Sequence, residues 1–151
     1  MKDTNLDNQD PFFEARNILD GLINALCTQK WLHAEHGDVE QLVHKDGFEL
    51  MRLLLQGHLD ERSRQEPDFD SVRQGTREHT HKRKNRSRQL NTLFGKVEVR
   101  RKSYSVGGAD SLFPQDAELN LSVDQYSDGL RRQIAFSVSE QSFDKASESI
   151  S

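Results

Sequence analysis

Residues Arg88–Tyr104 read RQLNTLFGKVEVRRKSY, and this stretch decides the fold that the sequence predicts. Two extended segments meet at Leu93–Lys96, where Gly95 can adopt the positive φ that a tight turn requires. Beyond the turn, Val97 and Val99 alternate with charged residues, as in a strand with one buried and one solvent-facing side. The stretch therefore predicts a β-hairpin whose solvent-facing side is mainly cationic.

Charge is segregated along the chain. The 151 residues have a formal net charge of −4, yet residues 73–102 alone hold 11 basic and 2 acidic residues. Such a local excess of positive charge attracts phosphate backbones whatever the total, although a solvated charge run is the alternative interpretation. We expect double-stranded DNA as the partner, because aromatic residues for stacking single strands are scarce in this region. The predicted phosphate contacts are Arg77, Lys82, Arg83, Lys84, Arg86, Arg88, Arg100, Arg101, Lys102, Arg131 and Arg132.

The first part of the chain has the apolar spacing of two amphipathic helices. Apolar residues recur at three- and four-residue steps over residues 11–30, with Asp10 as the N-cap. A second helix is predicted from Asp38, its N-cap, to about Arg62. We therefore expect an antiparallel helical hairpin over residues 1–62.

Six of the eight residues in Phe48–Leu55 are apolar, more than a single helical stripe requires. The excess predicts a second contact for this surface, with another copy of the chain or with a domain outside it. The residues expected to make it are Phe48, Met51, Leu54 and Leu55. In the alternative interpretation, Leu53 and Leu55 pack against the hairpin.

Three further parts complete an α+β organisation. Residues 63–87 have no apolar periodicity and contain Pro67 and Gly75, which predicts an exposed basic linker. Residues 88–117 form the β-hairpin unit. Residues 118–151 follow as a helical module.

Within this last module, Ser122 or Asp124 is expected to cap a helix that ends near Ser139. After a short break, Ser142 is expected to open a second helix. A helix, a turn and a helix resemble the start of a helix-turn-helix DNA reader.

Four segments carry a family resemblance: TLFGKVEVRRKSYS, SLFPQDAELNL, YSDGLRRQIA and SFDKASESI, in this order. Together they resemble the amino-terminal part of ISKra-type insertion-sequence transposases, over residues 38–151. The resemblance implies a parent enzyme that cuts and joins DNA, with Mg²⁺, through three acids in an RNase H-like domain beyond Ser151. For this chain it implies a truncated, non-catalytic fragment of a bacterial transposase that binds DNA or pairs with the intact enzyme. Ser103, Gly107 and Gly108 stand where related transposases often carry paired cysteines, so a zinc ribbon is not supported.

Other chemistries find little support in the sequence. The acidic start and the lack of an apolar stretch of roughly 18 residues favour a cytoplasmic location. Cys27, the only cysteine, is expected to be a buried thiol. The acids of the second half, among them Asp110, Asp116, Asp124, Asp128 and Asp144, are interpreted as caps and surface residues, so no catalytic set is predicted.

The histidines do not have the spacing of a zinc site, and no cofactor is expected in this chain. The histidines considered as possible metal ligands are His33, His36, His79 and His81. The alternative to a transposase fragment is a stand-alone DNA-binding or regulatory protein.

Overall fold

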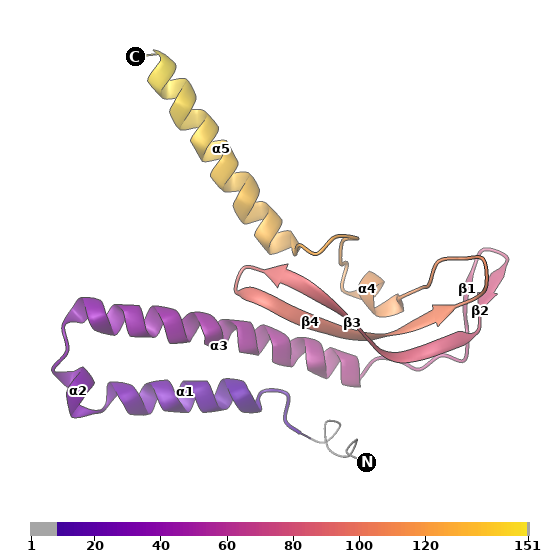
Figure 1. Ribbon diagram of the computed structural model, residues 1–151, viewed down its shortest axis with the longest axis horizontal. Coiled ribbons are helices and arrows are strands. Elements are labelled where there is room, and N and C mark those ends of the chain that lie inside the picture. The colour runs from indigo at the N-terminus through magenta and orange to yellow at the C-terminus, as the bar shows by residue number, and fades with distance from the viewer. Residues whose placement is uncertain (1–8, 151) are drawn as a thin grey trace.

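The computed structural model describes residues 9–150, and residues 1–8 of the predicted helical hairpin lie outside that range (Figure 1). Its elements confirm the α+β class: helices first, two antiparallel β-hairpins, then helices. In chain order they are α1 (Phe13–Leu26), α2 (Gln29–Leu32), α3 (His36–Arg64), β1 (Val72–Gln74), β2 (Arg77–His79), β3 (His81–Thr92), β4 (Gly95–Ser105), α4 (Pro114–Glu118) and α5 (Asp128–Ile150).

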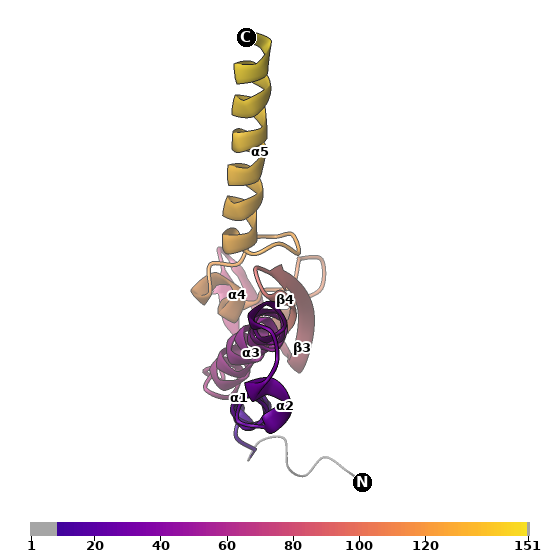
Figure 2. The ribbon, with the colours of Figure 1, turned by 90° about the vertical axis from the view of Figure 1, so that its left-hand side faces the viewer.

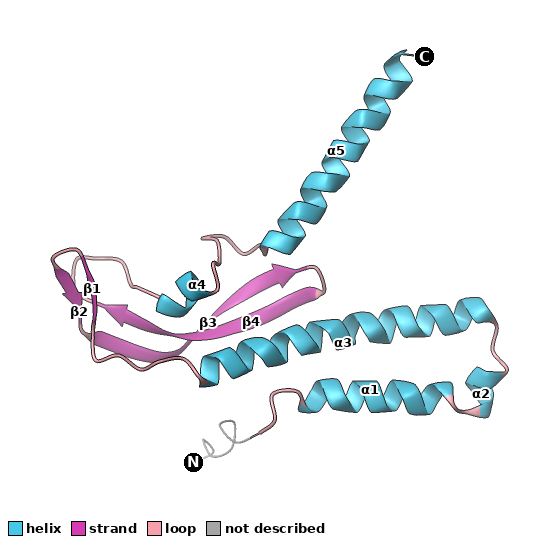
Figure 3. Cartoon of the chain, turned by 180° about the vertical axis from the view of Figure 1, so that it is seen from behind, coloured by secondary structure: helices cyan, strands magenta, loops and turns pink. Residues whose placement is uncertain are grey.

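Helices α1 and α3 lie side by side and antiparallel, joined through the short α2 (Figures 1 and 3). The first helix ends at Leu26, earlier than predicted, and the Thr28 hydroxyl donates to the Ala25 carbonyl at 2.6 Å just beyond it. Gly57 lets the chain before α1 approach α3 closely. A Cβ on Gly57 would lie 2.7 Å from Cδ1 of Phe12 and 2.8 Å from the Pro11 carbonyl oxygen.

The predicted hairpin is confirmed, with longer strands than the sequence suggested. Thr92 pairs with Gly95, so the turn consists of Leu93 and Phe94, and Gly95 follows it with φ +111°. The Thr92 hydroxyl donates to the Gly95 carbonyl at 2.7 Å and accepts from the Phe94 N–H at 3.2 Å. This side chain therefore braces the turn from inside.

The linker predicted over residues 63–87 is replaced over much of its length by strands β1 and β2 and the first part of β3. In β3, a bulge disturbs the strand pattern. Arg83 pairs with Ser103 and Arg86 with Arg101, so Lys84 and Asn85 together face a single residue, and Asn85 has φ +59°. The extra residue breaks the alternation of buried and exposed side chains by which a strand is predicted from sequence.

The core lies between α3 and the long β3–β4 ribbon. Leu59, Leu90, Val97 and Val99 are buried together, and Leu55, Leu119 and Leu121 pack against them. The ribbon's β4 edge is covered by side chains from α3 and the segment after it. Gln56 donates to the Glu98 carbonyl and accepts from the Glu98 N–H, both at 2.8 Å, and the Glu66 carboxylate accepts from the Lys102 N–H at 3.0 Å.

The β3 edge is covered only near the turn. Asn91 exchanges backbone bonds with the segment before α5, since its N–H donates to the Gln125 carbonyl and its carbonyl accepts from the Ser127 N–H. Gln89 pairs with Glu98, whose backbone bonds point away from β3, so the backbone groups of Gln89 point outward as well. Within residues 9–150 no backbone bond covers this edge between Lys82 and Gln89.

The predicted break before Ser142 is absent, because α5 is one continuous helix from Asp128 (Figure 2). Residues 137–142 include no Gly or Pro, so nothing in the sequence interrupts the helical backbone hydrogen bonds. Its cap is Ser127, whose hydroxyl accepts from the Leu130 N–H at 3.1 Å. The prediction of a helix-turn-helix start is therefore wrong for this region. Figure 2 shows α5 projecting away from the helix pair α1 and α3.

Candidate nucleic-acid interface

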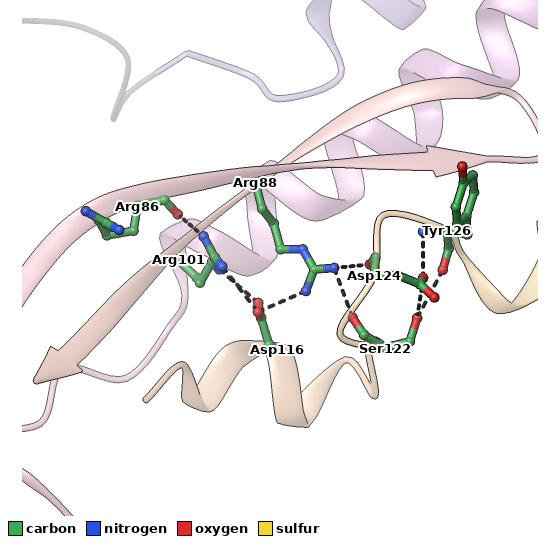
Figure 4. Close-up of polar contacts among 7 residues, drawn as sticks. All are labelled: Arg86, Arg88, Arg101, Asp116, Ser122, Asp124 and Tyr126. Carbon is green, nitrogen blue, oxygen red and sulfur yellow. Dashed lines mark hydrogen bonds and ion pairs between the residues drawn. The ribbon is translucent and has the colours of Figure 1, made fainter. Parts of the chain in front are cut away.

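Two arginines of the ribbon share one carboxylate, and this cluster ties the ribbon to α4 (Figure 4). Arg101 donates from Nε to Oδ1 of Asp116 at 2.9 Å, and Arg88 donates from Nη1 to Oδ2 at 3.2 Å. All three side chains are largely buried, with exposed fractions of 8% for Arg101 and 17% for the other two. The prediction that Asp116 is a cap or surface residue is therefore wrong.

The same arginines also bind backbone carbonyls. Arg88 donates from Nη2 to the carbonyls of Ser122 and Asp124, at 2.9 and 2.5 Å, and so fixes the loop before α5. Arg101 donates to the Arg86 carbonyl at 2.9 Å. Its guanidinium also lies 4.0 Å from the centre of the Phe113 ring. Both guanidinium groups are thus occupied inside the protein.

Several other predicted phosphate contacts also have partners within the protein. Lys82 donates to Asp68 at 2.8 Å, and this hydrogen bond raises the pKa of Lys82 and lowers the pKa of Asp68. Lys102 donates to the Glu66 carbonyl at 3.0 Å. Arg77 donates to the Gly108 carbonyl at 2.7 Å, Arg100 lies 3.6 Å from Glu98, and Arg131 pairs with Asp124.

The remaining predicted cations are free of such partners. Arg83, Lys84 and Arg86, named here the cationic bulge, are exposed and form no ion pair within residues 9–150. Arg132, on the first turns of α5, is also exposed and unpaired in that range. The cationic bulge therefore combines three exposed cations that form no ion pair in that range with the irregular point of the ribbon.

The pairing surface predicted on α3 divides in two. Phe48, Met51 and Leu54 are exposed, at 44%, 49% and 46%. Leu55 instead packs against the core, as the alternative interpretation proposed. Phe48 also contacts the hairpin turn, with its ring centre 5.9 Å from that of Phe94 in an edge-on arrangement.

The histidines and the cysteine do not assemble a site. Among the described residues, no group of three or more His, Cys, Asp or Glu is placed to hold a metal ion. His79 is 1% exposed, and neither ring nitrogen has a hydrogen-bond partner in the part of the chain that the structure describes. The prediction of a buried Cys27 is wrong, because this residue is exposed at the end of α1.

The sequence analysis did not predict the Asp116 cluster, although the alternation of residues along β4 indicates it. Arg101 falls on the same face as Val97 and Val99, so alternation alone places its charge toward the core. A buried charge requires a partner of opposite sign. Asp110 and Asp116 are the first two acids after the strand, and the structure shows that Asp116 is the partner.

Comparison with known proteins gives no relative: no model of a protein family, no curated protein and no solved structure matches this chain. Among the helices of residues 9–150, none combines the length and apolar character needed to cross a bilayer.

Proposed function

We propose that this chain is a non-catalytic DNA-binding module that contacts duplex phosphates through the cationic bulge. The single observation that supports this most is the separation of the basic residues into two classes. Arg88 and Arg101 are neutralised inside the protein, whereas Arg83, Lys84 and Arg86 are exposed and form no ion pair within residues 9–150. Unneutralised cations clustered on one element are what a phosphate backbone attracts.

Duplex DNA fits the ribbon better than a single strand does. A two-stranded antiparallel ribbon has dimensions that a major groove admits. Single-strand binding relies on aromatic platforms beside the cations, but of the two aromatic residues of the ribbon Tyr104 is fully buried and Phe94 packs on Phe48. Duplex phosphates are therefore the proposed ligand, with little preference for sequence.

We further propose, from the resemblance of its four segments, that the chain corresponds to the amino-terminal part of an insertion-sequence transposase. Two of these segments meet in the structure, since Arg101 of the first contacts Phe113 and Asp116 of the second. The parent enzyme would supply the Mg²⁺-dependent chemistry. This chain would supply DNA affinity.

The test is a titration of a labelled duplex with the full chain at several salt concentrations. Replacing Arg83, Lys84 and Arg86 by Ala should weaken binding and make the slope of log affinity against log salt shallower by about 3. The matched control replaces Lys30, Lys45 and Lys145, which removes the same charge elsewhere on the surface. Equal binding by the two triple variants would remove the cationic bulge from the proposal.

A second function, pairing with another copy or an intact relative, is favoured by the exposure of Phe48, Met51 and Leu54. Sedimentation velocity of the full chain across a concentration series measures self-association directly. Replacing Met51 and Leu54 by Gln should abolish any dimer that uses this surface. Replacing Leu19 and Ile23, exposed on α1, is the control that should leave such a dimer intact.

A further inference from the structure

A hollow of about 650 Å³ lies beside the β4 edge of the ribbon, to which its lining residue Glu66 is bonded through the Lys102 N–H. It is lined by two separate parts of the chain: the last turns of α3 with the segment that follows them, and α4. Its volume falls within the range of small-molecule sites, roughly 300–1,000 Å³. None of the residues of the cationic bulge lines it, so it does not depend on the proposed DNA contact.

The lining combines apolar walls with an excess of negative charge. Pro67, Phe69 and Pro114 contribute the apolar part. The carboxylates of Glu61, Glu66 and Glu118 line it together with the guanidinium of Arg62 and with His58. Glu61 is also paired with Arg64 at 3.2 Å, so the excess negative charge comes from Glu66 and Glu118. Such a lining favours a ligand that has both an apolar body and a positive charge.

Glu66 is the observation that distinguishes this hollow from an acidic surface patch. The residue is only 8% exposed, and its Oε2 accepts from the Lys102 N–H at 3.0 Å. Its Oε1 is buried and has no hydrogen-bond partner within the described residues. A buried carboxylate oxygen without a donor is unfavourable. Because Oε1 has almost no accessible surface, a ligand N–H reaches it only when the Glu66 side chain turns toward the hollow, and the hydrogen bond then removes that cost.

The wall beside Glu66 is held in place before any ligand arrives. The Phe69 N–H donates to the Tyr104 hydroxyl at 3.0 Å, and the two rings lie 6.2 Å apart. Tyr104 itself is fully buried, and Lys102 holds the Glu66 carbonyl. A fixed apolar wall next to an acceptor lowers the ordering cost of binding.

We propose that this hollow binds the cationic end of an apolar amine or guanidine, with Glu66 as its main acceptor. The ammonium or guanidinium N–H donates to the Glu66 carboxylate, while the apolar body lies against Phe69 and the prolines. A free small molecule and an arginine side chain of a peptide share this chemistry. The experiment therefore includes one probe for each source.

The test is isothermal titration of the full chain with 2-phenylethylamine and, separately, with N-acetyl-arginine methylamide. The neutral 2-phenylethanol has the same body without the charge, so it should bind at least about tenfold more weakly than the amine. Glu66→Gln should weaken the amine by a similar factor. Glu140→Gln, which removes a charge from the exposed face of α5, should leave binding unchanged.

The relative affinities of the three probes identify the ligand or overturn the proposal. Preference for the amine over the arginine derivative assigns a free small molecule, and the reverse assigns a peptide side chain. Equal binding of amine and alcohol by the parent chain would overturn the proposal without any variant, as would no measurable heat with either cationic probe at millimolar concentration. Perturbed amide signals of Phe69 and Lys102 during titration locate the probe if Glu66→Gln lowers stability.

Discussion

Arginine has two different roles in the basic stretch, and only the surroundings distinguish them. Arg101 is buried, paired with Asp116 and stacked on Phe113, so it acts as part of the core. Arg83 is exposed and unpaired within residues 9–150, so its charge is available to a ligand. Counting basic residues treats the two as equal, although only the second adds to the external potential.

Asp116→Asn should lower the free energy of unfolding by about 3 kcal/mol, the lower end of the range for breaking a buried ion pair. The lower end applies because the carboxylate keeps 17% exposure, and because the amide still accepts one hydrogen bond. Urea unfolding measures the change. Asp110→Asn, an exposed acid nearby, should change the value by less than about 0.5 kcal/mol, and equal losses would contradict the cluster.

Two glycines of α3 should respond in opposite directions to the same substitution. Gly47→Ala should stabilise by about 1 kcal/mol, since nothing lies within 4 Å of the added Cβ and alanine favours helix. Gly57→Ala should destabilise by roughly 1–3 kcal/mol, because the Cβ would collide with Phe12 and with the Pro11 carbonyl. Thermal unfolding of both variants gives the comparison, and two changes of one sign would refute the close approach.

At the scale of elements, the sequence predicted the helices and the turn that depend on local signals. The hairpin turn and the helix pair were found, because Gly95 and the apolar spacing of α1 and α3 are visible in the chain itself. The strands within residues 63–87 were missed, because both faces are polar and a bulge shifts the alternation. The Asp116 cluster was missed because its partners are brought together only by tertiary packing.

Helix α5 offers a test of its own start. Ser127→Ala removes the hydroxyl that accepts from the Leu130 N–H, which should weaken the first turn by about 1 kcal/mol. Amide hydrogen exchange at Leu130 should accelerate accordingly. Ser137→Ala is the control in the same helix, since its hydroxyl only donates back to the Gln133 carbonyl, and its loss should not speed exchange at Leu130.

At the scale of the whole molecule, buried acids make stability depend on pH. Burial raises the pKa of Glu66 above its usual 4.5, against the opposing hydrogen bond from Lys102 and the nearby charge of Arg101, while Asp116 raises it further. Burial likewise raises the pKa of Asp60 from 3.8, and its hydrogen bond from Gln56 opposes the shift. In both cases the folded state holds the proton more tightly than the unfolded state does.

The sign follows from that preference. The contribution of Glu66 to stability is greatest while it is protonated, and it declines as pH rises from its unfolded pKa through its raised folded pKa. Glu66→Gln cannot ionise, so its melting temperature relative to the parent chain should increase over that interval. Glu140→Gln serves as the control for a lost surface charge. A constant difference between Glu66→Gln and the parent from acid to neutral pH would contradict the effect of burial.

The irregular point in β3 also has a consequence for solubility. An uncovered strand edge can template pairing with other chains, and natural sheets prevent this with bulges and with charged side chains. The stretch from Lys82 to Gln89 has both, since Asn85 interrupts the register and three cations surround it. Deleting Asn85 would give a flat, regular edge, and we expect that variant to form fibrous aggregates, detected by light scattering, at concentrations where the parent chain stays clear. The residue that spoils the ribbon's regularity is thus its protection against polymerisation.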